Sequence, residues 1–299
     1  MKILLVLNPV SGGGEKTGFL EQATEFCEKY GFRLKVFETS GDNDLDQLSK
    51  TIDDFEPDRV VAAGGDGTVL LAGVALKNTA IPLGIVPMGS ANGMAEDLDV
   101  NPEPYTAFQD ALISQVTGGL DMLVVNNEHH AIHIGDMGIN ARIVEAYSKD
   151  ENRGMATYAK YFVAELRRME PIAFTIKHKD DTIKGEGIMI GICNARKYGT
   201  GVPINIDGNP MDGKFEIVII KTIDLNTLIM AGLAKIDERF HDSQNSTVIS
   251  TDAAEITFDK PRLLQLDGEV IGKFEKLEIK ILKHAITLIT QSGNKYLEQ

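Results

Sequence analysis

The sequence contains few cysteines, and those it has form no metal-binding pattern. Cys27 and Cys193 are the only two among 299 residues, and they lie far apart in the chain. Structural zinc sites draw on closely spaced ligand pairs, which this arrangement does not offer. We therefore expect two buried thiols in a protein of the reducing cytosol.

Long apolar runs are also lacking. The run near the N-terminus covers only residues 3–7, which is too short for the core of a signal peptide or for a membrane span. No other apolar stretch is long enough to cross a bilayer. We expect a cytoplasmic protein whose contact with a membrane is peripheral and transient.

Positive charge is scarce. The formal net charge is −14, with 30 Lys and Arg residues against 44 Asp and Glu residues. Because binding to nucleic-acid phosphates or to anionic lipid depends on Lys and Arg, we expect no nucleic-acid partner and no tight electrostatic adhesion to membranes. The hydrophobic fraction of 43% and the length of 299 residues suit two domains with proper cores.

The first part of the chain alternates short apolar runs with helical patterns, which is typical of a parallel sheet covered by helices on both faces. We therefore expect an open parallel α/β nucleotide-binding domain over residues 1–119. The expected strands are 3–7, 33–38, 59–63 and 82–86, and the expected helices are 15–30, 44–55, one after 68, one from 91 and one over 104–115.

The pattern changes at Gly118 and Gly119, after which most apolar runs follow one another as in an antiparallel, β-rich domain of the sandwich type. We expect this domain over residues 120–283, with residues 284–299 returning to the first domain and the site in the cleft between the two. Helices are expected at 155–169 and 225–235, and strands at 122–126, 131–134, 173–177, 187–193, 215–220, 255–258, 263–266 and 277–281.

Three glycine-rich turns each follow an expected strand. They are residues 8–14 (Asn-Pro-Val-Ser-Gly-Gly-Gly), 64–68 (Gly-Gly-Asp-Gly-Thr) and 89–93 (Gly-Ser-Ala-Asn-Gly). Glycine lets backbone N–H groups approach an anion closely, and a helix that begins after the turn adds its positive end. In a parallel sheet the three turns share one edge, where ligands of open α/β sheets bind. The sequence therefore predicts a polyphosphate site.

Asp66 stands within the second turn, where a carboxylate would repel a bound phosphate. A cation between the two groups removes this conflict, so we expect Asp66 to contact the Mg²⁺ of a bound nucleotide. The alternative is that Asp66 or Thr68 only caps the next helix. Three glycines and an aspartate exceed what a cap needs, which favours the nucleotide.

The other two turns are less specific. The first is not a P-loop, because Glu15 stands where that motif has a glycine before Lys16-Thr17. Walker NTPases are therefore disfavoured, as are NAD-type dehydrogenases, whose last motif glycine is replaced by Thr17. In the third turn, Ser90 either caps a helix from Ala91 or reaches a phosphate, and the sequence leaves both open.

A fourth feature lies far along the chain, at Leu266-Asp267-Gly268-Glu269. An Asp-Gly pair is a common hairpin turn, and that is the plain structural alternative. A kinase, however, needs a carboxylate near the attacking hydroxyl to accept its proton.

Four segments, taken in their order along the chain, resemble the diacylglycerol kinase catalytic family. This family holds bacterial lipid kinases and has sphingosine and ceramide kinases as relatives. The segments are residues 8–12, 64–68, 87–92 and 266–269, and they span nearly the whole chain. The resemblance implies a lipid kinase that transfers the γ-phosphoryl group of Mg-ATP to a lipid hydroxyl at a membrane surface, with Glu269 or Asp267 as general base and Asp66 beside Mg²⁺. The residues implied to hold ATP are Asn8, Pro9, Val10, Ser11, Gly12, Thr39, Gly64, Gly65, Asp66, Gly67, Thr68, Ser90 and Asn92.

The family also carries a structural Mg²⁺ site in its β domain. By resemblance this site would lie at Asp212-Gly213, with backbone oxygens near Asn209 and Lys214 completing it. An ordinary hairpin turn explains the same residues, and the sequence leaves both open.

The chain departs from the family pattern at three places, and each change removes a carboxylate. Leu70 and Leu71 replace Asn-Glu, Gly93 replaces an Asp after the third turn, and Asn140 replaces the Asp of a Gly-Phe-Asp element. Losing side-chain acceptors should weaken recognition of a small hydroxylated headgroup. The identity of the phosphorylated lipid is therefore left open. The sequence also leaves open whether the protein forms a homodimer.

Two other functions remain as alternatives. The missing carboxylates would suit a nucleotide- or lipid-binding protein without catalysis. The Gly-Gly-Asp-Gly-Thr element also occurs in NAD kinases. A soluble-substrate kinase of that type is therefore the other alternative, and we rank it lower. The histidines His129, His130 and His133 are expected at the surface, since two histidines four residues apart on a strand lie too far apart for one zinc.

Overall fold

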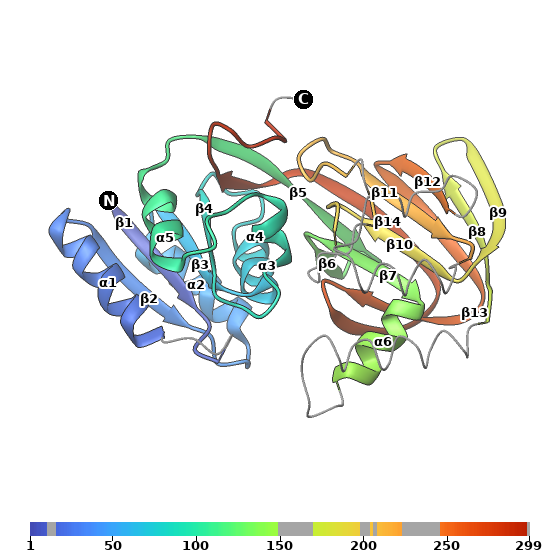
Figure 1. Ribbon diagram of the computed structural model, residues 1–299, viewed down its shortest axis with the longest axis horizontal. Helices are drawn as coiled ribbons and strands as arrows, with labels where there is room; N and C mark the ends of the chain where they lie inside the picture. Colours follow the sequence, from blue (N-terminus) through green and yellow to red (C-terminus); the bar gives the residue numbers. More distant parts are fainter. Residues whose placement is uncertain (11–15, 149–169, 198–203, 206–207, 223–245, 298–299) are drawn as a thin grey trace, which may run out of the picture. The chain divides into compact units, whose positions relative to one another are not determined.

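The computed structural model describes residues 1–10, 16–148, 170–197, 204–205, 208–222 and 246–297 (Figure 1). The chain divides into two compact units. Unit 1 holds Met1–Met122 and Lys283–Gln299, and unit 2 holds Leu123–Leu282. The domain boundaries expected from the sequence were after residues 119 and 283. None of the described helices is long and apolar enough to cross a membrane.

Unit 1 is built on a parallel sheet with the strand order β4-β3-β1-β2. Both alternating sets of side chains on β1 are buried, which requires cover on both faces of the sheet. An open parallel α/β unit was expected, and the fold confirms it. The strands are β1 (Lys2–Leu7), β2 (Arg33–Glu38), β3 (Arg59–Gly64) and β4 (Leu83–Pro87).

Two pairs of helices provide this cover (Figure 1). On one face Phe19 and Phe26 each pack edge-on against Phe108, in a core cluster shared with β1, β3 and β4. These aromatics belong to α1 (Lys16–Lys29) and α5 (Pro104–Ile113), whereas α2 (Asp44–Phe55) and α3 (Asp66–Ala75) contact each other and β1. A short helix, α4 (Gly93–Asp97), follows β4.

The C-terminal residues complete unit 1. The end of β14 (Glu269–Ile289) runs parallel to β4, with Leu288 opposite Leu83. The Tyr296 hydroxyl then donates to Oδ1 of the buried Asp97, at 2.9 Å, so the last residues are attached to α4.

Unit 2 is β-rich and mainly antiparallel, as expected. Its strand β13 (Ala253–Leu266) changes register between Thr257 and Arg262. The first half of β13 pairs with β8, and the last three residues pair with β7, so one strand serves two parts of the sheet around a shared apolar core. The other strands are β5 (Thr117–Val125), which begins in unit 1, β6 (His129–Ala131), β7 (Ile134–Gly138), β8 (Ile172–His178), β9 (Asp181–Gly187), β10 (Met189–Cys193), β11 (Phe215–Ile220) and β12 (Ser246–Thr251).

Several sequence expectations for this unit were wrong. Residues 131–134 are not one strand, because β6 ends at Ala131 and β7 begins at Ile134. The expected strands 255–258 and 263–266 form the single strand β13. The strands β9 and β12 and the helix α6 (Ile139–Ser148) were not expected at all. The helices expected at 155–169 and 225–235 lie outside the described residues.

Candidate active site

The three glycine-rich turns of unit 1 begin side by side at the carboxyl edge of the parallel sheet. The N–H of Asn8 donates to the Ala63 carbonyl at 3.1 Å, and the N–H of Met88 donates to the Gly64 carbonyl at 2.9 Å. These bonds hold the start of each turn beside its neighbour. The parallel strand order thus brings together three segments that are separated in the sequence.

The second and third turns touch at two glycines. A Cβ atom added to Gly89 would lie 2.4 Å from the Cα of Gly65, a backbone atom that cannot move aside easily. The backbones can approach this closely because Gly89 carries no side chain. A Cβ on Gly65 would lie 3.3 Å from the Cα of Gly89, which is also a tight contact.

The carboxylate of Asp66 also joins these two turns. Its Oδ2 accepts the N–H of Gly93 and its Oδ1 accepts the N–H of Met94, both at 2.9 Å. Asp66 begins α3, whereas Gly93 and Met94 begin α4. The aspartate therefore caps the following helix of the unit, and not its own helix as the capping alternative supposed.

The start of the third turn is held by Asn92. Its Oδ1 accepts the Gly89 N–H at 2.7 Å and its Nδ2 donates to the Gly89 carbonyl at 3.0 Å. Asn92 is the residue that precedes α4, and its backbone is left-handed. Ser90 is exposed and does not cap a helix from Ala91, since α4 begins at Gly93.

The first turn is described only in part. Asn8 accepts the N–H of Val10 through Oδ1, at 3.0 Å, while Pro9 and Val10 are exposed. Thr39 follows β2 and donates its N–H to the Leu7 carbonyl, which places it at the same edge. Ser11 and Gly12, also expected to hold ATP, lie outside the described residues.

Of the other expected contacts, Gly67 is exposed, whereas Gly64 and Thr68 are buried. A Cβ on Gly64 would lie 2.2 Å from Thr68 Oγ1, so these two residues pack directly against each other. Thr68 donates its N–H to the Gly65 carbonyl at 3.0 Å. Thr68 therefore lines the interior of the turn, and Gly67 is its accessible residue.

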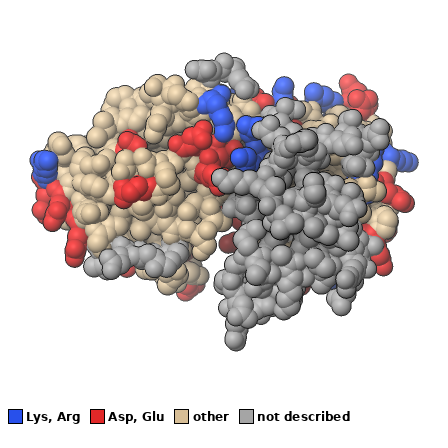
Figure 2. Space-filling view, viewed as in Figure 1, with Lys and Arg blue, Asp and Glu red and all other residues tan. Residues whose placement is uncertain are grey.

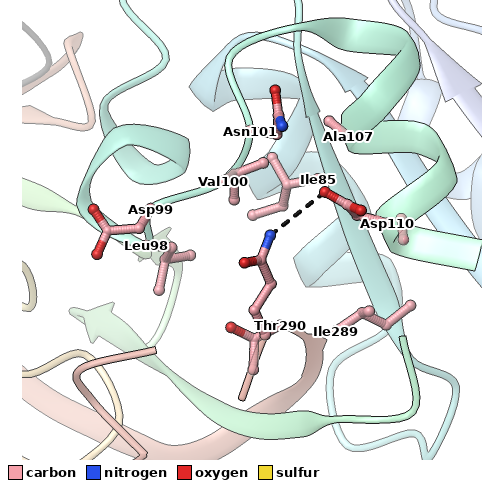
Figure 3. Close-up of a pocket in the computed structure, with 11 residues that line it drawn as sticks. Ile85, Leu98, Asp99, Val100, Asn101, Ala107, Asp110, Ile289 and Thr290 are labelled. Carbon is pink, nitrogen blue, oxygen red and sulfur yellow. Dashed lines mark hydrogen bonds between the residues drawn. The ribbon is translucent and has the colours of Figure 1, made fainter. Parts of the chain in front are cut away.

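The surface charge of unit 1 is mostly negative on the face drawn in Figure 2, where Asp and Glu outnumber Lys and Arg. A phosphate site here would therefore rely on backbone N–H groups and helix ends more than on basic side chains. A pocket elsewhere in unit 1, beside α5 and the C-terminal residues, has a volume of about 30 Å³ (Figure 3). That is room for about one water molecule and far too little for a nucleotide.

The residues present fit one Mg²⁺ ligand in unit 1. Each carboxylate oxygen of Asp66 accepts one N–H, and an ionised carboxylate has lone pairs left for a cation. Among the described residues there is no group of three His, Cys, Asp or Glu that could hold a metal by itself. Mg²⁺ commonly binds through one carboxylate together with substrate phosphates, which suits this arrangement.

In unit 2, Asp267 is occupied by the backbone. Its Oδ1 accepts the N–H groups of His133 (3.1 Å) and Ile134 (3.0 Å), and its Oδ2 accepts that of Ile132 (2.9 Å). The Asp267 N–H returns a bond to the Ile134 carbonyl at 3.0 Å. This carboxylate therefore holds the 132–134 segment against the turn, which also explains why β6 and β7 are separate strands.

Glu269 differs from Asp267, although only Gly268 separates them. Its side chain is exposed at the start of β14. The residues Asp267 and Gly268 have left-handed backbones, with φ of 48° and 87°, which makes this a tight turn. The turn thus presents one carboxylate to the surroundings and uses the other for its own structure.

The expected structural metal residues form an internally bonded turn. Asn209 Oδ1 accepts the N–H of Met211 and Asp212 Oδ1 accepts the N–H of Lys214. The Asn209 carbonyl is also approached by the Asp212 N–H, at 3.4 Å. These contacts agree with the hairpin alternative, and the Mg²⁺ site at Asn209, Asp212 and Lys214 stays a prediction.

The histidines were placed correctly only in part. His129 and His130 are half-buried, but His133 is 4% exposed, so its assignment to the surface was wrong. The backbone bonds from Asp267 and from Asn194 draw residue 133 inward. The residues that the sequence offered no means of finding are Asp136 and Gln265, both buried beside the Asp267 turn.

Comparisons with known proteins find two domain families in this chain. Residues 2–125 match the family described as "Diacylglycerol kinase catalytic domain", and residues 134–290 match "YegS C-terminal NAD kinase beta sandwich-like domain". A Pectobacterium atrosepticum protein named "Probable lipid kinase YegS-like" is 28% identical over 291 residues, which cover 95% of this chain and 94% of the relative.

Two further proteins extend the likeness over the full chain. The diacylglycerol kinase of Bacillus subtilis is 24% identical over 298 residues, covering 98% of both chains. The crystal structure of a diacylglycerol kinase from Bacillus anthracis has the same fold, with a TM-score of 0.75, 17% identity and 98% of each chain covered. The chain therefore belongs to the diacylglycerol kinase catalytic family, in the form whose second domain is the YegS C-terminal domain.

Proposed function

We propose that this protein transfers the γ-phosphoryl group of Mg-ATP to a hydroxyl group of a lipid at a membrane surface. Membership of a lipid kinase family supports both the kinase activity and the lipid substrate. The observation that carries the proposal is the meeting of the glycine turns at one sheet edge, with Gly65 against Gly89 and Asp66 bonded to Gly93.

In this mechanism the turns receive the phosphates. Phosphoryl transfer depends on positioning and on stabilising negative charge, and backbone N–H groups at helix starts supply both. Asp66 would hold Mg²⁺, which neutralises charge on the phosphates when it is bound. Asp66 also fixes the third turn through Gly93 and Met94, so it positions the site with or without the cation.

Glu269 would be the general base. A base must be able to accept the proton of the attacking hydroxyl, and Glu269 is the exposed carboxylate of the turn. Asp267 already accepts three backbone N–H groups, so its contribution is to keep the turn in place. Of the two residues that the sequence left open, we therefore propose Glu269 as the base.

The test is an assay with radiolabelled ATP and Mg²⁺ against diacylglycerol, monoacylglycerol, a sphingoid base and ceramide in mixed micelles. We expect one of these lipids to be labelled by the wild-type protein and not by the Asp66→Ala variant. If calorimetry shows Mg-ATP binding but no lipid is labelled, the protein is a binding protein. Formation of NADP from ATP and NAD would instead identify a soluble-substrate kinase.

A further inference from the structure

A buried carboxylate and a buried amide face each other in the interior of unit 2. Asp136 lies on β7 and is fully buried, and Gln265 lies on β13 and is 1% exposed. The two residues are directly opposite in the antiparallel pairing of these strands. Nε2 of Gln265 donates a hydrogen bond to Oδ2 of Asp136.

Each partner of this pair also bonds to a backbone group. Oε1 of Gln265 accepts the N–H of Gly268 at 2.8 Å, and Oδ1 of Asp136 accepts the N–H of Ala141 at 2.9 Å. Gly268 is the residue before Glu269, and Ala141 lies in the first turn of α6. Three consecutive hydrogen bonds therefore connect the start of α6 with the turn that carries Glu269.

These bonds fix which way the Gln265 amide points. The oxygen must face the Gly268 N–H, and the NH₂ group must face the carboxylate of Asp136. If the amide turned over, the NH₂ group would meet an N–H donor, and the oxygen would meet a carboxylate. Asp136 thus determines the orientation of the group that holds Gly268.

Core packing alone does not explain the pair. The neighbouring residues Met137, Leu264 and Leu266 belong to the apolar core of unit 2, whereas Asp136 and Gln265 are polar although they are buried. Burying a carboxylate is unfavourable unless hydrogen bonds compensate it, so a polar pair in this place suggests a specific role. The role is visible in the bonds to Gly268 and Ala141.

We propose that Asp136 and Gln265 are positioning residues for Glu269, which hold its turn in a single conformation from the interior of unit 2. The proposal rests on the function proposed for Glu269. The carboxylate of Asp267 fixes the turn on one side of Gly268, by bonding residues 132–134. Gln265 fixes Gly268 itself, and Asp136 holds Gln265 and α6 together.

The arrangement permits a test by exchanging the two chemical groups. In the double variant Asp136→Asn/Gln265→Glu, the new amide keeps its oxygen toward the Ala141 N–H and donates its NH₂ to the new carboxylate. That carboxylate still accepts the Gly268 N–H. All three bonds are kept, whereas each single variant places two donors or two carboxylates face to face. The single variants therefore break the chain of bonds, and the double variant restores it.

We expect each single variant to lower kcat for lipid phosphorylation by roughly tenfold or more, because small displacements of a reacting group are costly, with KM for ATP changed less than about twofold. We expect the double variant to recover kcat to within about threefold of wild type. Exchange of the Gly268 amide hydrogen should be faster in the single variants and slow again in the double variant. Thermal unfolding of each variant checks that it is folded.

The variant Glu269→Gln separates this inference from the proposed function. If Asp136 acts through Glu269, Asp136→Asn should lower kcat in the wild-type background but have little further effect beside Glu269→Gln. An equal additional loss in both backgrounds would overturn the positioning role and leave the base assignment standing. If Glu269→Gln itself leaves kcat unchanged, the assignment of Glu269 as general base fails, and amide exchange at Gly268 still decides whether the pair holds the turn. A double variant that stays as impaired as the single variants, in kcat and in exchange, would also overturn the inference.

Discussion

Asp66 and Gly93 lie 27 residues apart in the sequence, yet Oδ2 of Asp66 accepts the N–H of Gly93 at 2.9 Å. The second oxygen of the same carboxylate accepts the N–H of Met94. Asp66, which we propose as a ligand of Mg²⁺, is therefore also the cap of α4. Gly93, which stands where the family pattern has a carboxylate, donates its N–H to the aspartate of the preceding turn.

The variant Asp66→Ala should lose at least about 100-fold in phosphoryl transfer, because it removes both the clamp on the third turn and the ligand proposed for Mg²⁺. Amide exchange at Gly93 and Met94 should become faster in this variant. The matched control is Asp53→Ala, which removes an exposed carboxylate from α2. Wild-type transfer rates in Asp66→Ala would contradict both roles.

The variant Gly89→Ala should weaken Mg-ATP binding measured by calorimetry. The added Cβ would lie 2.4 Å from Gly65 Cα, so the second and third turns must separate. Gly293→Ala serves as the control, since a Cβ there meets no atom within 4 Å. Equal affinities in the two variants would show that contact between the turns is not needed for binding.

The two carboxylates of the turn at Asp267, Gly268 and Glu269 should differ in their effect on stability. Asp267→Asn keeps a residue that tolerates the left-handed backbone but turns an NH₂ group toward backbone donors, which should cost about 1–3 kcal/mol of unfolding free energy. Glu269→Gln should cost almost nothing, because that side chain is exposed. Urea denaturation measures both, and similar losses would mean that Asp267 does not hold the turn.

Stability should also decrease at alkaline pH because of Cys27. Burial raises the pKa of its thiol from 9.0 to about 11. Below pH 9 both the folded and unfolded states keep the proton, and the stability is complete. Between pH 9 and 11 the unfolded state releases the proton first, so the unfolding free energy should fall by about 1–3 kcal/mol relative to a Cys27→Ala variant. Parallel pH curves for the two proteins would contradict this.

The sequence was sufficient to predict the parallel sheet of unit 1. Strands β1, β3 and β4 are short and largely apolar, and Gly-rich turns mark where they end. The strands β2, β11 and helix α2 were predicted with the bounds that the structure has. The strands of unit 2 were harder to predict, because the exposed face of a half-buried strand interrupts the apolar pattern. Polar residues such as Lys273 and Lys276 made β14 look much shorter than it is.

The candidate functional residues also fall into those that the sequence could predict and those that it could not. Motifs within one turn, such as residues 64–68, can be read locally. The partners of Asp267 cannot, since Ile132 and His133 lie 135 and 134 residues away and contribute backbone N–H groups of any residue type. Asp136 and Gln265 are likewise joined only by the pairing of β7 with β13, and no local pattern announces that pairing.

The most direct test of the account is the rate of lipid phosphorylation by Glu269→Gln, measured with radiolabelled ATP beside the wild-type protein. If Glu269 accepts the proton of the lipid hydroxyl, kcat should fall by about 10²–10⁴-fold while the melting temperature stays unchanged. A folded Glu269→Gln protein that phosphorylates the lipid at the wild-type rate would contradict it.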